Sequence, residues 1–353
     1  MEQSSYRWVI VAAGGLMGCV VMGAMFALPV LLTPMAEDTG WSRTGISAAM
    51  TVGFLAMAVT AMIWGALSDR FGARPVVLAG AVLFSSSLWL AGHAPSLLAF
   101  QMIFGVMVGG STAAFFAPMM ATVTGWFTTQ RSLAVSLVSA GMGMAPVTMS
   151  PLAARLAESH DWRGVLSILA GIVAVVTIPT AFLLRRPPLQ MAETRMTADA
   201  PDSSMTVRSA VRSPQFLVLV ATNFFCCATH SGPIFHTVSY AQLCGIGALA
   251  AVSIYSVEGI AGMFGRIGFG VAGDRFGAKR VLVAGLLAQS FGALGYFFAG
   301  DLAAFYTVAA LFGFIYAGIM PLYAVLVREN FPMKMMGTIM GGTGMAGILG
   351  MAT

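Results

Sequence analysis

Four ionisable side chains stand inside long apolar stretches of the sequence: His230, His236, Glu258 and Arg266. An arginine guanidinium presents a planar fork of donors that suits the two oxygens of a carboxylate. A carboxyl group or an imidazole can take up and release a proton. Because ionisable groups within membrane-spanning segments are costly and usually functional, Arg266 is a candidate anion-binding residue. Glu258 and His230 are candidate proton carriers.

Arg266 also has a structural interpretation. It precedes Asp274 by eight residues, which places it about 12 Å along a helix from the loop that holds this aspartate. At that depth its guanidinium could pair with Glu258 or with backbone carbonyls instead of a substrate. Glu258 lies eight residues before Arg266, so the two side chains would point about 80° apart around the helix.

His230 and Tyr316 are likewise open to two interpretations. Gly232 and Pro233 closely follow His230, and they are expected to interrupt its helix and free backbone groups. His230 would then bind substrate, relay a proton or satisfy a freed carbonyl. Tyr316 would donate a hydrogen bond to a carboxylate or anchor the chain at the membrane interface. The histidines have no carboxylate at ligand spacing, so neither a metal nor a cofactor is expected.

The composition predicts the environment of these residues. Of the 353 residues, 58% are hydrophobic and 9% are charged, which is more apolar side chain than one soluble core can bury. The net charge of +5 is small and the basic residues are not clustered with aromatic ones, which favours lipid headgroups as partners and argues against nucleic acid. The sequence has no G-x-x-x-x-G-K-S/T string. Its absence disfavours an ATP-driven pump, and no enzyme is expected.

Uninterrupted apolar stretches predict an all-helical integral membrane protein, because roughly 20 apolar residues in a helix cross about 30 Å of hydrocarbon. Eleven helices are expected at about 8–33, 45–67, 75–94, 97–124, 131–155, 163–184, 215–239, 246–272, 280–298, 301–327 and 336–353. A stretch rich in Pro, Ser and charge separates the sixth from the seventh. The sequence therefore predicts an N-terminal six-helix bundle at 1–184, a linker at 185–213 and a C-terminal bundle at 214–353.

The basic residues predict the orientation, since short loops rich in Lys and Arg stay on the cytoplasmic side. With the N terminus inside, most of the 18 bases fall on that side, and Arg43, Arg155 and Arg163 fall outside. We therefore expect a multi-pass protein of a bacterial-type inner, or plasma, membrane. Its N terminus and its linker are expected in the cytoplasm, and the sequence favours no particular oligomeric state.

Two loops repeat one another. GALSDRFGAR stands between the second and third predicted helices, and GVAGDRFGAKR stands between the eighth and ninth, with Asp69 and Asp274 at a spacing of 205. Gly72 and Gly277 would permit the tight turns, and each aspartate can accept hydrogen bonds from free amides at a neighbouring helix start. The basic residues can pair with carboxylates or helix ends, or anchor at headgroups. The loop residues expected to act in gating are Gly65, Asp69, Arg70, Gly72, Arg74, Asp274, Arg275, Gly277 and Lys279.

These strings resemble the loop signature of the major facilitator superfamily, G-x-x-x-D-R-x-G-R-R, at its two expected places. The resemblance implies two six-helix bundles around a central cavity that opens alternately to each side of the membrane. It also implies a length, because a second half matching the first would run to about residue 390. About 37 residues would then follow Thr353, so the second bundle is expected to be truncated within helix eleven.

The eighth helix narrows the resemblance to one branch. The string GMFGRIGFGVAGDRFG resembles the monocarboxylate transporter and oxalate:formate antiporter branch, where an arginine at the place of Arg266 binds the substrate carboxylate. APMMATVTGWFTTQRSLAVSLVSAGMGMAPVTMSPLA resembles the same branch in its small residues, which allow close helix packing. Two departures matter. Gly262 stands where eukaryotic members have an aspartate, and no base occurs between Met335 and Thr353, where the oxalate carrier has a lysine.

The expected function is secondary transport of a small organic anion, with protons or a counter-anion as the coupled species. One membrane cation favours a substrate with one carboxylate, hence a monocarboxylate. A proton-coupled exporter of drugs or other hydrophobic solutes is the alternative, because Gly141, Ala145 and Pro146 half match the G-x-x-x-G-P pattern of such exporters. A membrane sensor or partner-binding protein that transports nothing is an alternative of another class.

Overall fold

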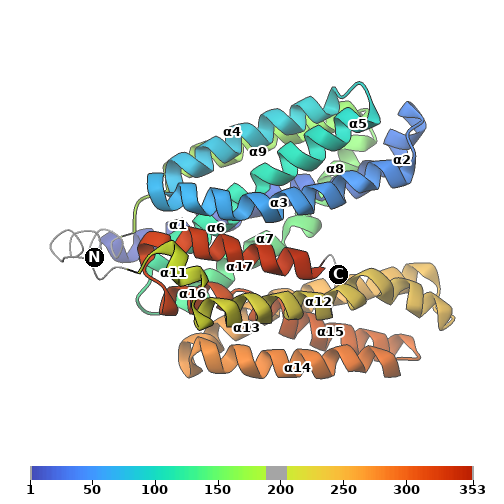
Figure 1. The fold of residues 1–353 in the computed structure, drawn as a ribbon. Helices are drawn as coiled ribbons and strands as arrows, with labels where there is room; N and C mark the ends of the chain where they lie inside the picture. The colour runs from blue at the N-terminus through green and yellow to red at the C-terminus, as the bar shows by residue number, and fades with distance from the viewer. Residues whose placement is uncertain (1, 188–204, 352–353) are drawn as a thin grey trace.

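The computed structural model describes residues 2–187 and 205–351. Every regular element in those two ranges is a helix, which confirms the predicted all-helical fold. The first half comprises α1 (Glu2–Met25), α2 (Leu28–Thr39), α3 (Arg43–Phe71), α4 (Ala73–Gly92), α5 (Leu97–Phe100), the π-helix η1 (Gln101–Gly109), α6 (Gly110–Trp126), α7 (Arg131–Gly143), α8 (Ala145–Ala157) and α9 (Trp162–Phe182). The second half comprises α11 (Val207–Val211), α12 (Pro214–Leu243), α13 (Ala248–Phe276), α14 (Ala278–Phe298), α15 (Leu302–Ile319), α16 (Leu322–Asn330), the short 3₁₀ helix η2 (Met333–Met335) and α17 (Met336–Met351) (Figure 1).

The long helices match the predicted membrane segments. In the described part, nine continuous helical stretches are long and apolar enough to cross a membrane. The helices α13 and α17 stand at the two remaining predicted positions. Several spans consist of two helices in series, because a proline has no backbone N–H to continue the ladder. Pro29 lies at the start of α2, and Pro321 directly precedes α16.

Large apolar side chains cover the outer faces of the helices. Val175 on α9 and Phe291 on α14 are 74% and 73% exposed. Such surfaces would be unfavourable in water but suit contact with lipid tails. Between the helices lies a packed core, in which Phe84, Phe104 and Trp162 are fully buried. Burial towards neighbouring helices and apolar exposure on the outside are the arrangement expected of a membrane bundle.

The seventh predicted membrane helix corrects one expectation. We expect Gly232 and Pro233 to interrupt it, but α12 continues as one helix of 30 residues through both positions. A proline removes a single helical hydrogen bond, and the bonds on either side maintain the helix. Two side chains also satisfy carbonyls near this point: the hydroxyl of Ser231 donates to Ala228, and that of Tyr255 donates to Ile234.

The two halves repeat the same helices. Both α3 and α13 contain 29 residues, and the bounds of α13 are those of α3 shifted by the 205 residues that separate the two signature aspartates. The division into bundles at 1–184 and 214–353 stays a prediction. The predicted linker, 185–213, lies largely outside the described residues, at 188–204, and its last part contains the short helix α11.

Two pairs of helices join the halves side by side. The helix α17 packs along α3, and α7 packs along α13 (Figure 1). Glycines allow the close approach: a Cβ at Gly65 on α3 would collide with the backbone of Gly337 on α17, and one at Gly270 on α13 would lie 2.8 Å from the Cβ of Ser136 on α7. We call these contacts the α3–α17 seam and the α7–α13 seam.

Candidate functional site

The first signature aspartate binds the start of a helix in the other half. The carboxylate of Asp69, near the end of α3, accepts hydrogen bonds from the backbone N–H groups of Gly337 and Thr338, both at 2.7 Å. It also accepts one from the Thr338 hydroxyl at 2.6 Å. The first N–H groups of a helix have no partner within the helix and carry partial positive charge. A carboxylate therefore caps α17 and ties it to α3.

The second signature aspartate makes the matching contact in the reverse direction. The Asp274 carboxylate, near the end of α13, accepts hydrogen bonds from the backbone N–H groups of Ser132 at 2.8 Å and Leu133 at 3.0 Å. These two residues begin α7, and they precede Gly337 and Thr338 by the same 205 residues that separate the aspartates. Each half thus caps the equivalent helix of the other half. We call the end of the molecule that holds these contacts the loop end.

The other loop residues have simpler surroundings. Gly72 and Gly277 have φ of 90° and 93°, conformations that favour glycine, as the turns require. Within the described ranges, no ion pair joins the loop bases to a carboxylate. Lys279 is exposed. Three arginines instead lie over phenylalanine rings: Arg70 over Phe71, Arg74 over Phe182 and Arg275 over Phe276.

Arg266 lies in the α7–α13 seam. Its Nε donates a hydrogen bond to the hydroxyl of Ser139 on α7 at 3.1 Å. Its guanidinium also packs against Gly143, where an added Cβ would collide with Nη1. The side chain therefore extends from the second half of the molecule onto a helix of the first half. Both contacts, with Ser139 and with Gly143, are made by the guanidinium group of Arg266 itself.

The charge of Arg266 has no counter-ion among the residues that the structure describes. The structural alternative of a pair with Glu258 is not formed, because Glu258 binds His230 instead. The equivalent position in the first half, 205 residues earlier, is Ala61, which packs against Gly341. Since the same seam forms there without a cation, packing of the seam alone does not require an arginine.

His230 and Glu258 form a buried pair between α12 and α13. Their side chains meet at 3.1 Å, between Nε2 of the histidine and Oε1 of the glutamate. His230 is 5% exposed and Glu258 is 9% exposed. The remaining polar atoms, Nδ1 and Oε2, are buried and have no hydrogen-bond partner among the residues that the structure describes. A buried polar group without a partner is costly, and such groups often mark a site of function. His236, by contrast, is exposed.

Tyr316 packs against this pair. Its ring stacks on the imidazole of His230 with centroids 3.6 Å apart and planes within 5°. Its hydroxyl contacts the thiol of Cys227 at 3.8 Å. Phe312, one turn earlier on α15, stacks on the same imidazole at 5.6 Å. The three helices α12, α13 and α15 therefore bring His230, Glu258, Tyr316 and Arg266 into one region.

Gly262, which stands where the resembled branch has an aspartate, lies in a close contact between α13 and α15. A Cβ on Gly262 would lie 3.0 Å from the Cβ of Ala317 and 3.3 Å from the carbonyl oxygen of Gly313. Three residues on, a Cβ at Gly265 would collide with the backbone of α15 at Phe314. The helices α13 and α15 are thus in close contact along this face. In this packing a side chain at 262 would press on Ala317 and Gly313 of α15, which would have to shift by a few tenths of an ångström.

Sequence reasoning did not find the partners of the site residues. Ser139 contacts Arg266 across 127 positions of chain, and no local pattern marks it. The partners of the two signature aspartates, however, are related by the same 205-residue repeat as the aspartates themselves. Once the 205-residue repeat is known, a contact between Asp274 and Ser132 predicts one between Asp69 and Gly337.

A chain of apolar spanning helices, with two repeated halves that cap one another's helices, defines a multi-pass membrane transporter. It belongs to the Major Facilitator Superfamily, whose sequence profile matches residues 14–353. It is therefore a member of a family of membrane transporters. The family confirms the resemblance drawn from the two signature loops.

Individual proteins show how far the similarity extends. Monocarboxylate transporter 13 of Bos taurus is 27% identical over 275 residues, which cover 76% of this chain and 62% of that protein. Monocarboxylate transporter 11 of Mus musculus is 34% identical over 190 residues, which cover 51% of this chain and 40% of that protein. The chain therefore spans less than two thirds of the length of these relatives. The crystal structure of the transporter FucP in the outward conformation has the same fold, with a TM-score of 0.78, 12% identity and coverage of 98% of this chain and 90% of that one.

Proposed function

We propose that this transporter carries a small monocarboxylate across the membrane, with Arg266 as the residue that binds the carboxylate. The observation that carries the proposal is the guanidinium in the α7–α13 seam, which reaches from one half to the other and has no counter-ion in the described part of the chain. A guanidinium binds a carboxylate through two parallel hydrogen bonds. An anion bound there would contact both halves, which is what a site served by alternating access requires.

The repeat and the relatives support this assignment. Arg266 stands at a position where the other half has Ala61, so the cation is not part of the shared architecture of the seams. Two of the similar proteins are named monocarboxylate transporters. One positive charge balances one carboxylate, and a second carboxylate would remain uncompensated at membrane depth, where charge is costly.

We further propose that the His230–Glu258 pair carries the coupled proton. With one proton between them, the pair is neutral overall. Without it, the pair carries one negative charge in largely apolar surroundings, which is unfavourable. That charge would also repel an incoming carboxylate. Anion binding and proton uptake therefore favour each other, as coupled transport requires. Tyr316 stacks on His230, and Glu258 of the pair shares the helix α13 with Arg266.

The loop end is proposed to be cytoplasmic and to form the inner gate. The basic loops and the start of the linker lie there, as the charge rule predicts. The caps made by Asp69 and Asp274 close both seams at this end. Release of substrate to the cytoplasm would require these contacts to break, so the described conformation is closed on that side.

Uptake by the full-length protein in proteoliposomes tests the substrate class. Labelled lactate, pyruvate and formate should enter saturably under an inward proton gradient, whereas the dicarboxylate oxalate should enter at least about tenfold more slowly. Liposomes without protein give the background. Faster uptake of oxalate than of every monocarboxylate would contradict the single-carboxylate assignment, and no saturable uptake of any of the four would overturn the transport proposal.

A further inference from the structure

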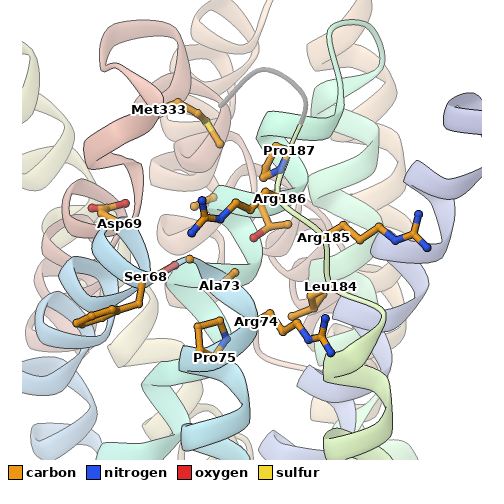
Figure 2. Close-up of a pocket in the computed structure, with 14 residues that line it drawn as sticks. Ser68, Asp69, Ala73, Arg74, Pro75, Leu184, Arg185, Arg186, Pro187 and Met333 are labelled. Atoms are coloured by element: carbon orange, nitrogen blue, oxygen red, sulfur yellow. The ribbon is translucent and has the colours of Figure 1, made fainter. Parts of the chain in front are cut away.

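A pocket lies at the loop end, away from Arg266. It has a volume of about 350 Å³, within the range of pockets that hold small ligands. Its walls come from the end of α3, the start of α4, α6, the chain at 184–187 and Met333, the first residue of η2 (Figure 2). The pocket is therefore formed by both halves of the molecule.

The lining of this pocket is positively charged. Arg74, Arg185 and Arg186 all contribute to it, and among the described residues of the lining Asp69 is the one carboxylate. Both oxygens of Asp69 already accept hydrogen bonds from the start of α17. Among the described residues, no carboxylate forms an ion pair with any of the three arginines. The lining therefore carries a net positive charge without a counter-ion.

The arginines are held in different ways. Figure 2 shows the Arg186 side chain extended into the pocket on the Asp69 side, whereas Arg74 and Arg185 point away from Asp69. Arg74 lies over the ring of Phe182 at 4.7 Å, and Arg185 lies over that of Tyr6 at 4.2 Å. Ring contacts leave guanidinium N–H groups free to donate. Arg186 is thus the residue best placed to bind a group inside the pocket.

Backbone donors add to the arginines. The helix α4 begins at the pocket, and its preceding residue, Gly72, supplies no side-chain cap. The first N–H groups of such a helix have no helical partner and attract anions. The start of the linker is also fixed, because the indole N–H of Trp126 donates to the carbonyl of Arg185 at 3.2 Å.

We propose that this pocket binds a phosphate group, carried by an anionic lipid headgroup or present as free phosphate. Guanidinium groups bind phosphate oxygens through paired hydrogen bonds, and basic pockets between membrane helices bind lipid headgroups. An occupied pocket would favour the closed loop end, because its walls come from α3, α4 and the start of the linker on one side and from Met333 of the second half on the other. This inference is independent of the transported substrate.

A binding experiment on the full-length protein tests the site and separates the two sources. The protein is placed in nanodiscs of phosphatidylcholine and titrated with short-chain phosphatidic acid or with inorganic phosphate, and binding is followed by calorimetry. Saturable binding of either probe is expected. Arg186→Gln should weaken it at least about tenfold, because one charged donor group is lost. Arg208→Gln is the matched control, since Arg208 is an exposed arginine on α11 outside the pocket.

The outcomes are distinct. Binding of phosphatidic acid without competition by phosphate assigns the site to a lipid headgroup, and binding of phosphate alone assigns it to the free ion. Either result supports the proposal if the Arg186 variant loses affinity while the Arg208 variant does not. Saturable binding by neither probe, or equal affinity of wild type and both variants, would overturn it. Arg186 is exposed, so its replacement leaves the core packing unchanged.

Discussion

Charge is balanced differently at the two ionisable sites of the second half. Glu258 has His230 as its partner, so removal of either leaves a buried charge or polar group uncompensated. Arg266 has a neutral hydroxyl as its hydrogen-bond partner, supplied by Ser139, and it is free to accept an anion. We therefore assign the anion to Arg266 and the proton to the His230–Glu258 pair. Each assignment can be tested by a single substitution.

The first prediction concerns the coupled proton. Glu258→Gln removes the negative charge of the pair while keeping the shape of the side chain. Proton-driven accumulation of substrate should fall to the level of passive equilibration, because proton binding no longer changes the charge of the site. Exchange of internal for external labelled substrate at equal pH should persist. Accumulation of substrate in the variant to the wild-type level under a proton gradient would refute the role of Glu258.

The second prediction concerns the position of the Arg266 guanidinium. Gly143→Ala places a methyl group where the end of Arg266 lies, so the side chain must shift. We expect kcat/KM for uptake to fall on the order of tenfold, since small displacements of a binding group weaken transport of the bound species. Gly171→Ala is the control, because its Cβ would meet open space in α9. An equal effect of both substitutions would show that Gly143 does not position Arg266.

The reciprocal caps close the two seams separately at the loop end. Each cap satisfies free N–H groups at a helix start with a carboxylate from the other half. The caps are formed by equivalent residues, so loss of one weakens one seam and leaves the other intact. The repeat therefore supplies an internal control for any experiment on the gate.

Hydrogen exchange measures the caps directly. In Asp69→Asn, the amides of Gly337 and Thr338 should exchange about tenfold faster or more, since a charged acceptor is worth about 1.5–3 kcal/mol per hydrogen bond. The amides of Ser132 and Leu133 should keep their wild-type rates. Asp274→Asn should give the reverse pattern. Equal protection of the start of α17 in wild type and Asp69→Asn would mean that the carboxylate does not hold this helix.

The sequence predicts the helices well and their contacts poorly. Apolar length alone locates the spans, because crossing hydrocarbon imposes a minimum run of apolar residues. The expected break at Pro233 is wrong, because the cost of one lost hydrogen bond is smaller than the gain from continuing the helix. Arg266 is identifiable as a charge in an apolar run, but its neighbour Ser139 is an ordinary serine whose place depends on the packing of α7 against α13.

At the scale of the whole molecule, the asymmetric distribution of bases predicts which end faces the cytoplasm. Cys244 is exposed just beyond α12, at the end of that helix remote from the linker, so it should lie outside. An impermeant thiol reagent should label it in intact cells. In a Cys244→Ser background, Glu158→Cys should also react, whereas Arg208→Cys should react after permeabilisation alone. Labelling of position 208 and protection of position 158 in intact cells would reverse the proposed orientation.

Arg266 is the residue of the α7–α13 seam that we propose to bind the substrate. The most direct measurement is uptake of labelled monocarboxylate by proteoliposomes containing wild type, Arg266→Ala or Arg266→Lys, with the exposed Arg155→Ala as control. Alanine should lower kcat/KM roughly 100-fold, since an anion at depth loses its charged partner, and lysine should recover part of the loss. Arg155→Ala should match wild type. Uptake by Arg266→Ala with wild-type kinetics would contradict the assignment of Arg266 as the anion-binding residue.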